Sequence, residues 1–443
     1  TRNSDLDIDE EAEDLLLEIE KSIKKRKRGR PVRLEIAHKC DKQTRHFLIE
    51  TLKVKDTDIY SIQGPIDLTF FTKFAGLNGC EQLCFEPIIP VYPPADFFEH
   101  KNVFDAIKEK DRMLHHPYES FKCVVDFVRQ AAEDENVLAI KQTLYRVSGN
   151  SPIVAALIKA AENGKQVTVL VELKARFDEE NNILCYVHMG TGNYNDSTAK
   201  IYTDISLFTC KEPYGMDASS LFNVLTGYSR PPEYNKFAVA PHGLRSFFVQ
   251  MIEREIENSK KGLPSGIIVK VNSLVDPEMI ELMYKASQNG VNVQLIVRGI
   301  CCLIPGIPGI SENISVHSIV GQLLEHSRIF QFENAGNPKI YMGSADWMQR
   351  NLDHRVELVF PIEDPDLQKR AFDIVQTMLN DTINTRLLQN DTTYIEIDKR
   401  SKAPFNSQYE FSVYAKEAVA KLEALDESKP YTPIRRADLE KMK

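Results

Sequence analysis

The hydrophobic pattern of this 443-residue chain repeats itself in the middle of the sequence. Two nearly continuous aliphatic runs, 137–144 and 167–173, flank a stretch that opens at Ser151-Pro152 and closes at Asn163-Gly164. A capping residue followed by Pro, and Asn-Gly at the far end, are typical boundaries of a helix. Short continuous aliphatic runs are typical of buried parallel strands, so the pattern predicts a strand, a helix and a second strand.

The same pattern returns about 126 positions later. Runs at 267–271 and 293–297 flank a stretch that opens at Asp276-Pro277 and closes at Asn289-Gly290. Strand, helix and strand in this order fold as a right-handed crossover between parallel strands. We therefore predict an α/β fold with two related domains.

The region before the repeat is less regular. From Pro31 to Pro94 short strand-like and helical pieces alternate, and a linker is predicted from the four prolines Pro87, Pro90, Pro93 and Pro94. We expect a smaller α+β region over 1–94, a first α/β domain over 95–236, and a second over 237–443 that includes a C-terminal tail. An acidic start and a Lys/Arg-rich end predict a helix within 5–28.

Two stretches have weaker patterns. His115-His116 precedes an amphipathic helix predicted over 121–132, and no carboxylate or cysteine stands at ligand spacing, so we expect a loop and helix cap there and no metal. The polar tail 402–443 is weakly periodic around 415–425. We expect a loosely held terminus, with a helix that contacts a partner as the alternative.

Composition narrows the function. With 42% hydrophobic and 27% charged residues the chain can build two or three packed cores. A net charge of −9 argues against bulk attraction to nucleic acid or to an anionic membrane. The eight cysteines are scattered, which favours reduced thiols in the cytosol. No apolar run reaches about 18 residues, so we expect neither a membrane span nor a signal peptide. The chain begins at Thr1 without Met, and we expect it to be part of a longer protein.

His326 is the most informative residue. It stands two positions before Arg328, and Gly343-Ser344-Ala345-Asp346 follows about seventeen positions on. An imidazole can act as nucleophile or acid, the guanidinium can hold phosphate oxygens, and a small glycine-serine turn can bring backbone N–H groups to the same anion. We therefore expect His326 to be a site residue, although a lone histidine is more often part of a core.

The first copy contains only part of this arrangement. Gly190-Thr191-Gly192-Asn193 repeats the glycine element, but no histidine-x-lysine precedes it. Gly190 and Gly343 are 153 positions apart, whereas the helix ends are 126 apart, so the first copy is about 27 residues short. We infer that a segment is absent between Ile183 and Leu184, and that it carried a second histidine.

Basic residues follow the predicted strands. Arg146 follows the first strand of the first copy, Lys174 and Arg176 follow its second, and Arg298 follows the second strand of the second copy. Ligands of open α/β sheets bind at such strand ends, so these residues are predicted to converge on a polyphosphate. The alternative is local pairing with an acid such as Glu172. Tyr202 can stack on a base, and Asp204 can orient an imidazole or hold a metal.

With these residues assembled, the chain resembles polyphosphate kinase, an ATP:polyphosphate phosphotransferase whose two C-terminal domains are of the phospholipase D type. The resemblance runs from residue 5 to about residue 388. The motifs that carry it include Gly29-Arg30-Pro31-Val32-Arg33, His115-His116-Pro117-Tyr118, Leu144-Tyr145-Arg146, Leu173-Lys174-Ala175-Arg176-Phe177-Asp178-Glu179, Gly190-Thr191-Gly192-Asn193-Tyr194-Asn195, Tyr202-Thr203-Asp204, Asn272-Ser273-Leu274-Val275-Asp276-Pro277, Val297-Arg298-Gly299, Leu324-Glu325-His326 and Gly343-Ser344-Ala345-Asp346-Trp347-Met348.

The resemblance implies a reversible transfer of the terminal phosphate of ATP to polyphosphate, through a phosphohistidine and with Mg²⁺. It implies that Tyr202, Arg298 and His326 contact the nucleotide, and that Arg146 and Arg176 contact the magnesium-bound phosphates. His326 would be the second histidine, a general acid or transition-state contact. The supporting residues would be Asp204, Lys174, Arg328, Asn193, Ser344 and Asp346.

The resemblance also implies what is absent. The phosphorylated histidine belongs in the gap after Ile183, and a domain that helps to hold adenine belongs before Thr1. A homodimer or homotetramer in the cytoplasm is expected, with peripheral association at the inner membrane face as an alternative. Two other functions stay open: a phosphodiesterase or phosphatidyl transferase of the phospholipase D type, and an inactive polyphosphate-binding protein.

Overall fold

The structure, a computed structural model, describes residues 1–2, 29–74, 77–79, 81–144, 151–171, 184–227, 229–398 and 403–427. The chain forms two compact units, Thr1–Glu86 and Pro87–Lys443, and each is described by itself. The helix predicted within 5–28 lies outside the described residues.

The first unit is built around one strand-helix-strand element. Strands β1 (Leu34–Ala37) and β2 (Ile59–Ile62) pair in parallel, and helix α2 (Lys42–Leu52) connects them. The Asp41 carboxylate caps α2 by accepting a hydrogen bond from Thr44 N at 2.9 Å. The short helix α3 (Phe71–Phe74) and a 3₁₀ turn at Glu81–Leu83 follow.

The second unit contains both predicted strand-helix-strand repeats. The first consists of β4 (Ala139–Leu144), α6 (Pro152–Glu162) and β5 (Gln166–Val171). The second consists of β9 (Gly266–Val271), α9 (Pro277–Gln288) and β10 (Asn292–Val297). Both strand pairs are parallel, and Ser151 and Asp276 cap the two helices as predicted.

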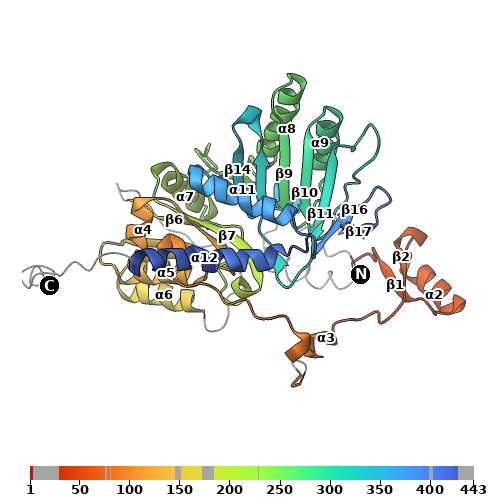
Figure 1. Cartoon of the computed structure of the whole chain (residues 1–443), viewed down its shortest axis with the longest axis horizontal. Helices are drawn as coiled ribbons and strands as arrows, with labels where there is room; N and C mark the ends of the chain where they lie inside the picture. Colours follow the sequence, from red (N-terminus) through yellow and green to blue (C-terminus); the bar gives the residue numbers. More distant parts are fainter. Residues whose placement is uncertain are drawn as a thin grey trace, which may run out of the picture. The chain divides into compact units, whose positions relative to one another are not determined.

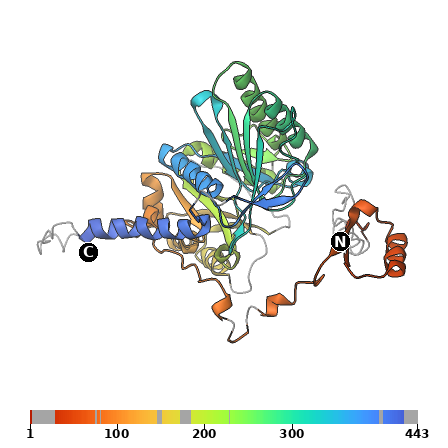
Figure 2. The same cartoon turned by 45° about the vertical axis from the view of Figure 1, so that its right-hand side comes forward.

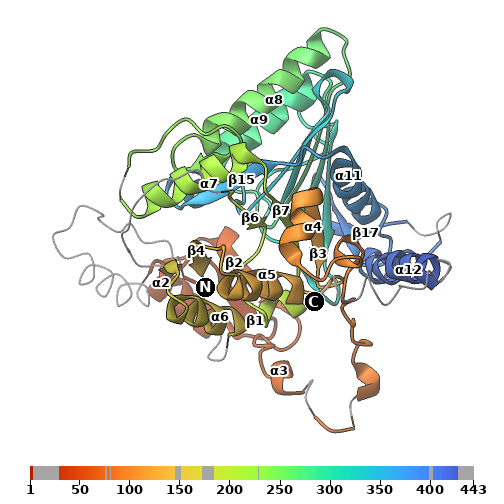
Figure 3. The same ribbon diagram turned by 90° about the vertical axis from the view of Figure 1, so that its left-hand side faces the viewer.

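The second repeat lies in a nine-stranded mixed sheet (Figure 1). Its order is β17-β16-β11-β10-β9-β13-β14-β15-β8. Its remaining strands are β8 (Ala238–Ala240), β11 (Ile314–Ile319), β13 (Ile329–Phe332), β14 (Lys339–Gly343), β15 (Glu357–Pro361), β16 (Thr385–Leu388) and β17 (Tyr394–Glu396). Helices α8 (Leu244–Lys260) and α9 pack on one face and α11 (Pro365–Leu379) on the other, with α10 (Gln349–Asp353) between β14 and β15 in the chain (Figure 3).

The first repeat belongs to a half with smaller sheets. Strands β3 (Arg112–His116), β6 (Val187–Gly190) and β7 (Tyr202–Thr209) form one sheet together with the two-residue strand β12 (Leu324–Glu325), and β4 and β5 form another. Helices α4 (Val103–Glu109), α5 (Lys122–Glu133) and α7 (Glu212–Leu225) complete this half. It lies against the large sheet (Figure 2), and one hydrophobic core joins both, with Ile205 and Leu207 of β7 beside Met342 and Phe360 of the large sheet.

Two expectations from the sequence were wrong. His115 and His116 do not form a loop: they end β3, which pairs with β7, and both side chains are buried. The tail is not loosely held as a whole, because Ser407–Glu427 forms the long helix α12 (Figures 1 and 2). Its first turns are fixed by buried contacts, among them those of Ser407, Gln408 and Phe411.

The α/β fold class is confirmed by these layers of helices on strands. Among the residues that the structure describes, no helix combines the length and the apolar character that crossing a membrane requires.

Candidate active site

His326 lies where the two halves of the second unit meet. The two-residue strand β12 (Leu324–Glu325) precedes it and pairs in parallel with β7, so a segment of the second half joins a sheet of the first. His326 N donates to Thr203 O at 3.3 Å and to Thr203 Oγ1 at 3.2 Å. The backbone of the histidine is therefore held by the first half of the unit.

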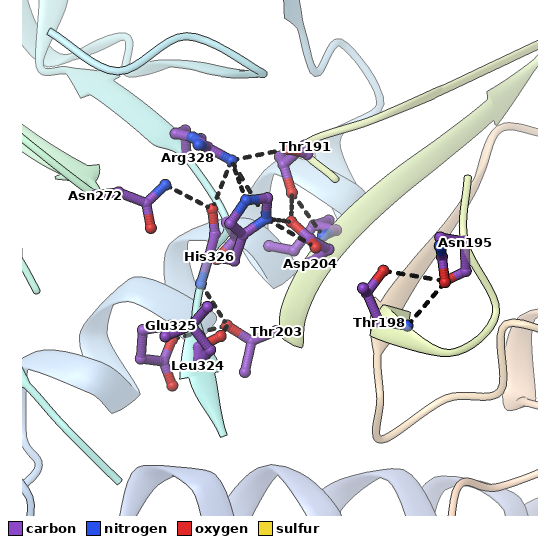
Figure 4. Close-up of polar contacts among 12 residues, drawn as sticks. Thr191, Asn195, Thr198, Thr203, Asp204, Asn272, Leu324, Glu325, His326 and Arg328 are labelled. Atoms are coloured by element: carbon purple, nitrogen blue, oxygen red, sulfur yellow. Dashed lines mark hydrogen bonds and ion pairs between the residues drawn. The ribbon is translucent and has the colours of Figure 1, made fainter. Parts of the chain in front are cut away.

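The imidazole of His326 contacts a carboxylate (Figure 4). Its Nδ1 lies 2.9 and 3.0 Å from the two oxygens of Asp204, and Thr191 Oγ1 donates to Asp204 Oδ1 at 2.7 Å. Burial alone would raise the pKa of Asp204, but the charge of His326, its hydrogen bond and that of Thr191 outweigh burial and lower this pKa. Asp204 is therefore ionised at neutral pH and orients the ring.

A glycine makes room for this carboxylate. A Cβ on Gly192 would lie 2.1 Å from Asp204 Oδ2. No side chain fits at that distance, which explains the second glycine of the Gly-Thr-Gly-Asn element.

Arg328 lies against the ring on another side. Its Nη1 is 3.3 Å from Nδ1 and 3.2 Å from Nε2 of His326, and it donates to Thr191 O at 3.1 Å. Asp346 binds the same guanidinium at 3.2 and 3.1 Å. Burial alone would raise the pKa of Asp346, but the charge of Arg328 and a hydrogen bond from Asn272 N outweigh burial and lower it. Arg328 is thus held by a carboxylate on the far side from the imidazole.

A buried lysine fixes the chain on both sides of His326. Lys270 Nζ donates to Ser327 O at 2.8 Å and lies 3.4 Å from Glu325 Oε2. Glu325 Oε2 also accepts from Thr203 Oγ1 at 2.9 Å. Burial lowers the pKa of Lys270, while the charge of Glu325 opposes that shift. These contacts hold the residues before and after the histidine in one geometry.

Tyr202 and Arg298 border the same site. The Tyr202 ring centroid is 5.1 Å from that of His326. Arg298 Nε donates to Asn272 Oδ1 at 2.6 Å, and Asn272 Nδ2 donates to His326 O at 3.2 Å. Burial lowers the pKa of Arg298, and the neighbouring charge of Arg328 lowers it further. The guanidiniums of Arg298 and Arg328 therefore make the surroundings of the ring favourable for an anionic ligand.

Two backbone N–H groups of the glycine elements, those of Ser344 and Thr191, are used within the sheets. Ser344 N donates to Leu358 O at 2.9 Å, and Thr191 N donates to Ile205 O at the same distance. The hydroxyls of the same two residues bind carboxylates. Asn193 lines a cavity beside Asp204. Arg146, Lys174 and Arg176 lie outside the described residues.

Sequence reasoning missed Glu357. Ser344 Oγ donates to its carboxylate, as Thr191 Oγ1 does to that of Asp204. Glu357 follows Ser344 by thirteen positions, and Asp204 follows Thr191 by the same number. Burial raises the pKa of Glu357. The repeat offset of 153 residues, applied to Asp204, would have identified Glu357 as its counterpart.

Two histidines, the buried His116 and the half-buried His188, share a cavity with Asp204. The cavity is lined by both rings and by Asn193, Tyr194 and Asp204. Burial lowers the pKa of His116, and it lowers that of His188 to about 3. Both rings are therefore neutral at pH 7.

The described residues offer no group of three or more His, Cys, Asp or Glu that could hold a metal ion. Asp204 and Asp346 are occupied by His326 and Arg328. The site consists of an oriented imidazole beside guanidiniums, which is typical of proteins that act on phosphoryl groups.

Comparisons with known proteins agree with this class. Residues 1–74 match the family model "Polyphosphate kinase middle domain", 102–186 and 184–231 match "Polyphosphate kinase C-terminal domain 1", and 237–408 match "Polyphosphate kinase C-terminal domain 2". The chain therefore belongs to the polyphosphate kinase family.

Individual relatives are similar over most of the chain. The polyphosphate kinase of Lactiplantibacillus plantarum is 47% identical over 457 residues, which cover 94% of this chain and 63% of the relative. That of Halalkalibacterium halodurans is 47% identical over 453 residues, covering 93% and 64%. The crystal structure of polyphosphate kinase from Porphyromonas gingivalis matches with a TM-score of 0.77 at 30% identity, over 88% of this chain and 65% of that one. The chain thus spans just under two thirds of the length of these relatives.

The alignments also indicate an internal gap. The 457 aligned positions of the L. plantarum relative take in 94% of 443 residues, about 416, so about 41 positions have no counterpart in this chain. The match to C-terminal domain 1 is broken into two stretches that meet at 184–186. Both observations agree with a segment absent after Ile183.

Proposed function

We propose that the protein catalyses the reversible transfer of the terminal phosphate of ATP to inorganic polyphosphate, and that a phosphohistidine carries the phosphate between them. The observation that supports this most is the His326 imidazole, which Asp204 holds at 2.9 Å beside Arg328. Membership of the polyphosphate kinase family supports the choice of substrates.

The chemistry needs two histidines. In the first step an imidazole nitrogen attacks the terminal phosphorus of ATP, the bond from that phosphorus to the bridging oxygen breaks, and ADP leaves. In the second, the terminal oxygen of polyphosphate attacks the same phosphorus and the N–P bond breaks. The nucleophile would belong to the segment absent between Ile183 and Leu184.

His326 would act as the second histidine. Asp204 accepts a hydrogen bond from Nδ1, which leaves Nε2 to give a proton to the leaving phosphate oxygen or to bind that oxygen in the transition state. Arg328 and Arg298 would offset the negative charge that collects there. Tyr202 and Arg298 would contact the nucleotide, and Asn193, Ser344 and Asp346 would support the site.

Arg146, Arg176 and Lys174 are proposed as phosphate contacts outside the described residues. A guanidinium cannot ligate Mg²⁺, and the described residues lack a carboxylate cluster for it. Mg²⁺ would therefore be held mainly by the phosphate oxygens of ATP, whose charge it would reduce.

A second candidate is a polyphosphate-binding protein without catalysis. It is favoured by the absence of a histidine-x-lysine motif before Gly190. The intact mass of the native polypeptide distinguishes the two: 50.5 kDa supports the inactive protein, and a mass larger by a segment and a further domain supports the kinase.

The activity itself is tested with radiolabelled ATP. An acid-labile, base-stable label on histidine together with long-chain polyphosphate supports the kinase. Cleavage of a lipid or nucleic acid without consumption of ATP would instead favour a phosphodiesterase. A homodimer or homotetramer in the cytoplasm is also proposed, and light scattering of the purified protein measures the oligomeric state.

A further inference from the structure

The C-terminal helix α12 reaches the strand that carries His326 through one side chain. Gln408, in the first turn of α12, is buried with 2% of its surface exposed. Its Oε1 accepts from Leu323 N at 3.0 Å, and its Nε2 donates to Leu323 O at 3.0 Å and to Glu325 Oε1 at 2.7 Å. The carboxamide thus pairs with the backbone of Leu323 as a neighbouring strand would. Leu323 directly precedes β12.

The chain passes close to this contact at Gly321. A Cβ on Gly321 would lie 2.5 Å from Gln408 Oε1. Glu325, which receives the Gln408 amide on one oxygen, receives Thr203 and faces Lys270 on the other. Without the amide donor, one oxygen of a buried carboxylate would lose its partner, which is costly enough to move the side chain.

Two anchors keep the first turns of α12 in place. Ser407 N and Oγ both donate to Asp381 Oδ2 at 2.8 Å. One turn further, the Phe411 ring centroid lies 4.7 Å from that of His115 and 5.4 Å from that of Tyr118. Gln408 stands between these anchors, so its position depends on the seating of the helix.

We propose that Gln408 is a positioning residue for His326, and that α12 must be seated for the imidazole to keep its contact with Asp204. Glu325 is the covalent neighbour of His326, and β12 is only two residues long. A shift of Glu325 therefore moves the imidazole relative to Asp204, which belongs to β7. This proposal rests on the proposed function in one respect only, namely that His326 is needed for turnover.

The test reads the tautomer of the His326 ring rather than activity. Nitrogen NMR of histidine-labelled protein, assigned with His326→Gln and recorded at a pH above which the ring signals no longer change, should find one tautomer with the proton on Nδ1, as the Asp204 contact requires. Gln408→Met has the same length and no hydrogen bonds, and should give a mixture of the two tautomers. The matched control Tyr409→Ala changes an exposed neighbour on the same helix and should leave the single tautomer intact.

Gln408→Glu is the second variant, in case the first does not fold. It keeps an acceptor for Leu323 N, loses both donors and places a carboxyl group beside Glu325, so it should also give mixed tautomers in the same measurement. A single tautomer in either variant, when folded, overturns the proposal, because a merely structural role would lower the melting temperature and leave the ring unchanged. The measurement uses no ATP, so it stands even if the protein transfers no phosphate.

Discussion

The described strands of the first half of the second unit have counterparts in the second half, which also contains β11, β16 and β17. Gly190 pairs with Ser206 as Gly343 pairs with Val359, and all four positions are related by an offset of 153 residues. Ala139 pairs with Gln166 as Gly266 pairs with Asn292. Between these pairs the second half contains His326 and Arg328, whereas the sequence of the first half contains no histidine followed two positions later by Lys or Arg.

In the second half β13 bridges β9 and β14, so the sheet is continuous. In the described residues of the first half, no strand bridges their counterparts β4 and β6, and β4 with β5 forms a separate sheet. β13 begins one residue after Arg328. We therefore infer that the segment expected after Ile183 would supply both the second histidine and the strand that joins the first half into one sheet.

The largest effect is expected from restoring that segment. We predict that the L. plantarum stretch between the counterparts of Ile183 and Leu184, inserted there, raises phosphotransfer on the order of 10⁴-fold or more, because it supplies the nucleophile. Product formation from radiolabelled ATP measures this. An insertion of equal length made of Gly and Ser is the control, and equal activity of both chains would refute the comparison.

His326→Ala in the restored chain should lower turnover by about 10²- to 10⁴-fold, the range of a general acid. The fold should persist, which circular dichroism checks. His46→Ala, an exposed histidine of the first unit, is the matched control. Near-normal turnover in the His326 variant would mean that its role is misassigned.

Glu357 is expected to orient the restored histidine as Asp204 orients His326. Glu357→Gln in the restored chain should lower turnover by about 10- to 100-fold, the usual effect of losing such a partner. Asp204→Asn should give a loss of similar size. If Glu357→Gln left turnover unchanged while Asp204→Asn lowered it, the two halves would not be functionally equivalent.

Arg298→Ala should weaken nucleotide binding about 10-fold, because a charge-assisted hydrogen bond contributes about 1.5 kcal/mol or more. Calorimetric titration with a non-hydrolysable ATP analogue measures it. Lys261→Ala, at the exposed end of α8, serves as control. Unchanged affinity would remove Arg298 from the nucleotide site.

The smallest expected effect is the pH dependence of folding stability that comes from two histidines of the first half. The folded-state pKa of His188 is about 3 and that of His116 is lowered as well, so both histidines bind protons more readily when unfolded. Their contribution to stability is complete above about pH 6.5, the usual histidine pKa, and is lost as pH falls below it, by up to about 1.4 kcal/mol per pH unit for His188. Urea unfolding at pH 7.5 and 5.5 measures this, and a smaller drop is expected in His188→Asn.

Part of this architecture could be predicted from the sequence. The two strand-helix-strand repeats could be predicted because buried parallel strands are continuous runs of aliphatic residues. Their helices also begin with clear capping residues, Ser151 and Asp276. His326, Tyr202, Asp204 and Arg328 also lie together, at the point where β12 joins β7.

Other features depend on tertiary contacts that leave little trace in the pattern. The end of β3 contains two histidines whose burial follows from pairing with β7, and α12 buries polar side chains such as Ser407 and Gln408 rather than an apolar stripe. The backbone of the glycine-serine turn is used by the sheet, which only the register of β14 and β15 reveals.

The central claim is that this site needs two histidines facing one phosphate. Brief exposure of the segment-restored chain to ATP labelled in its terminal phosphate tests it most directly. We predict an acid-labile label on the histidine of the restored segment, and faster loss of that label to ADP when His326 is intact than in His326→Ala. A label on His326 itself, or none on any histidine, would contradict the account.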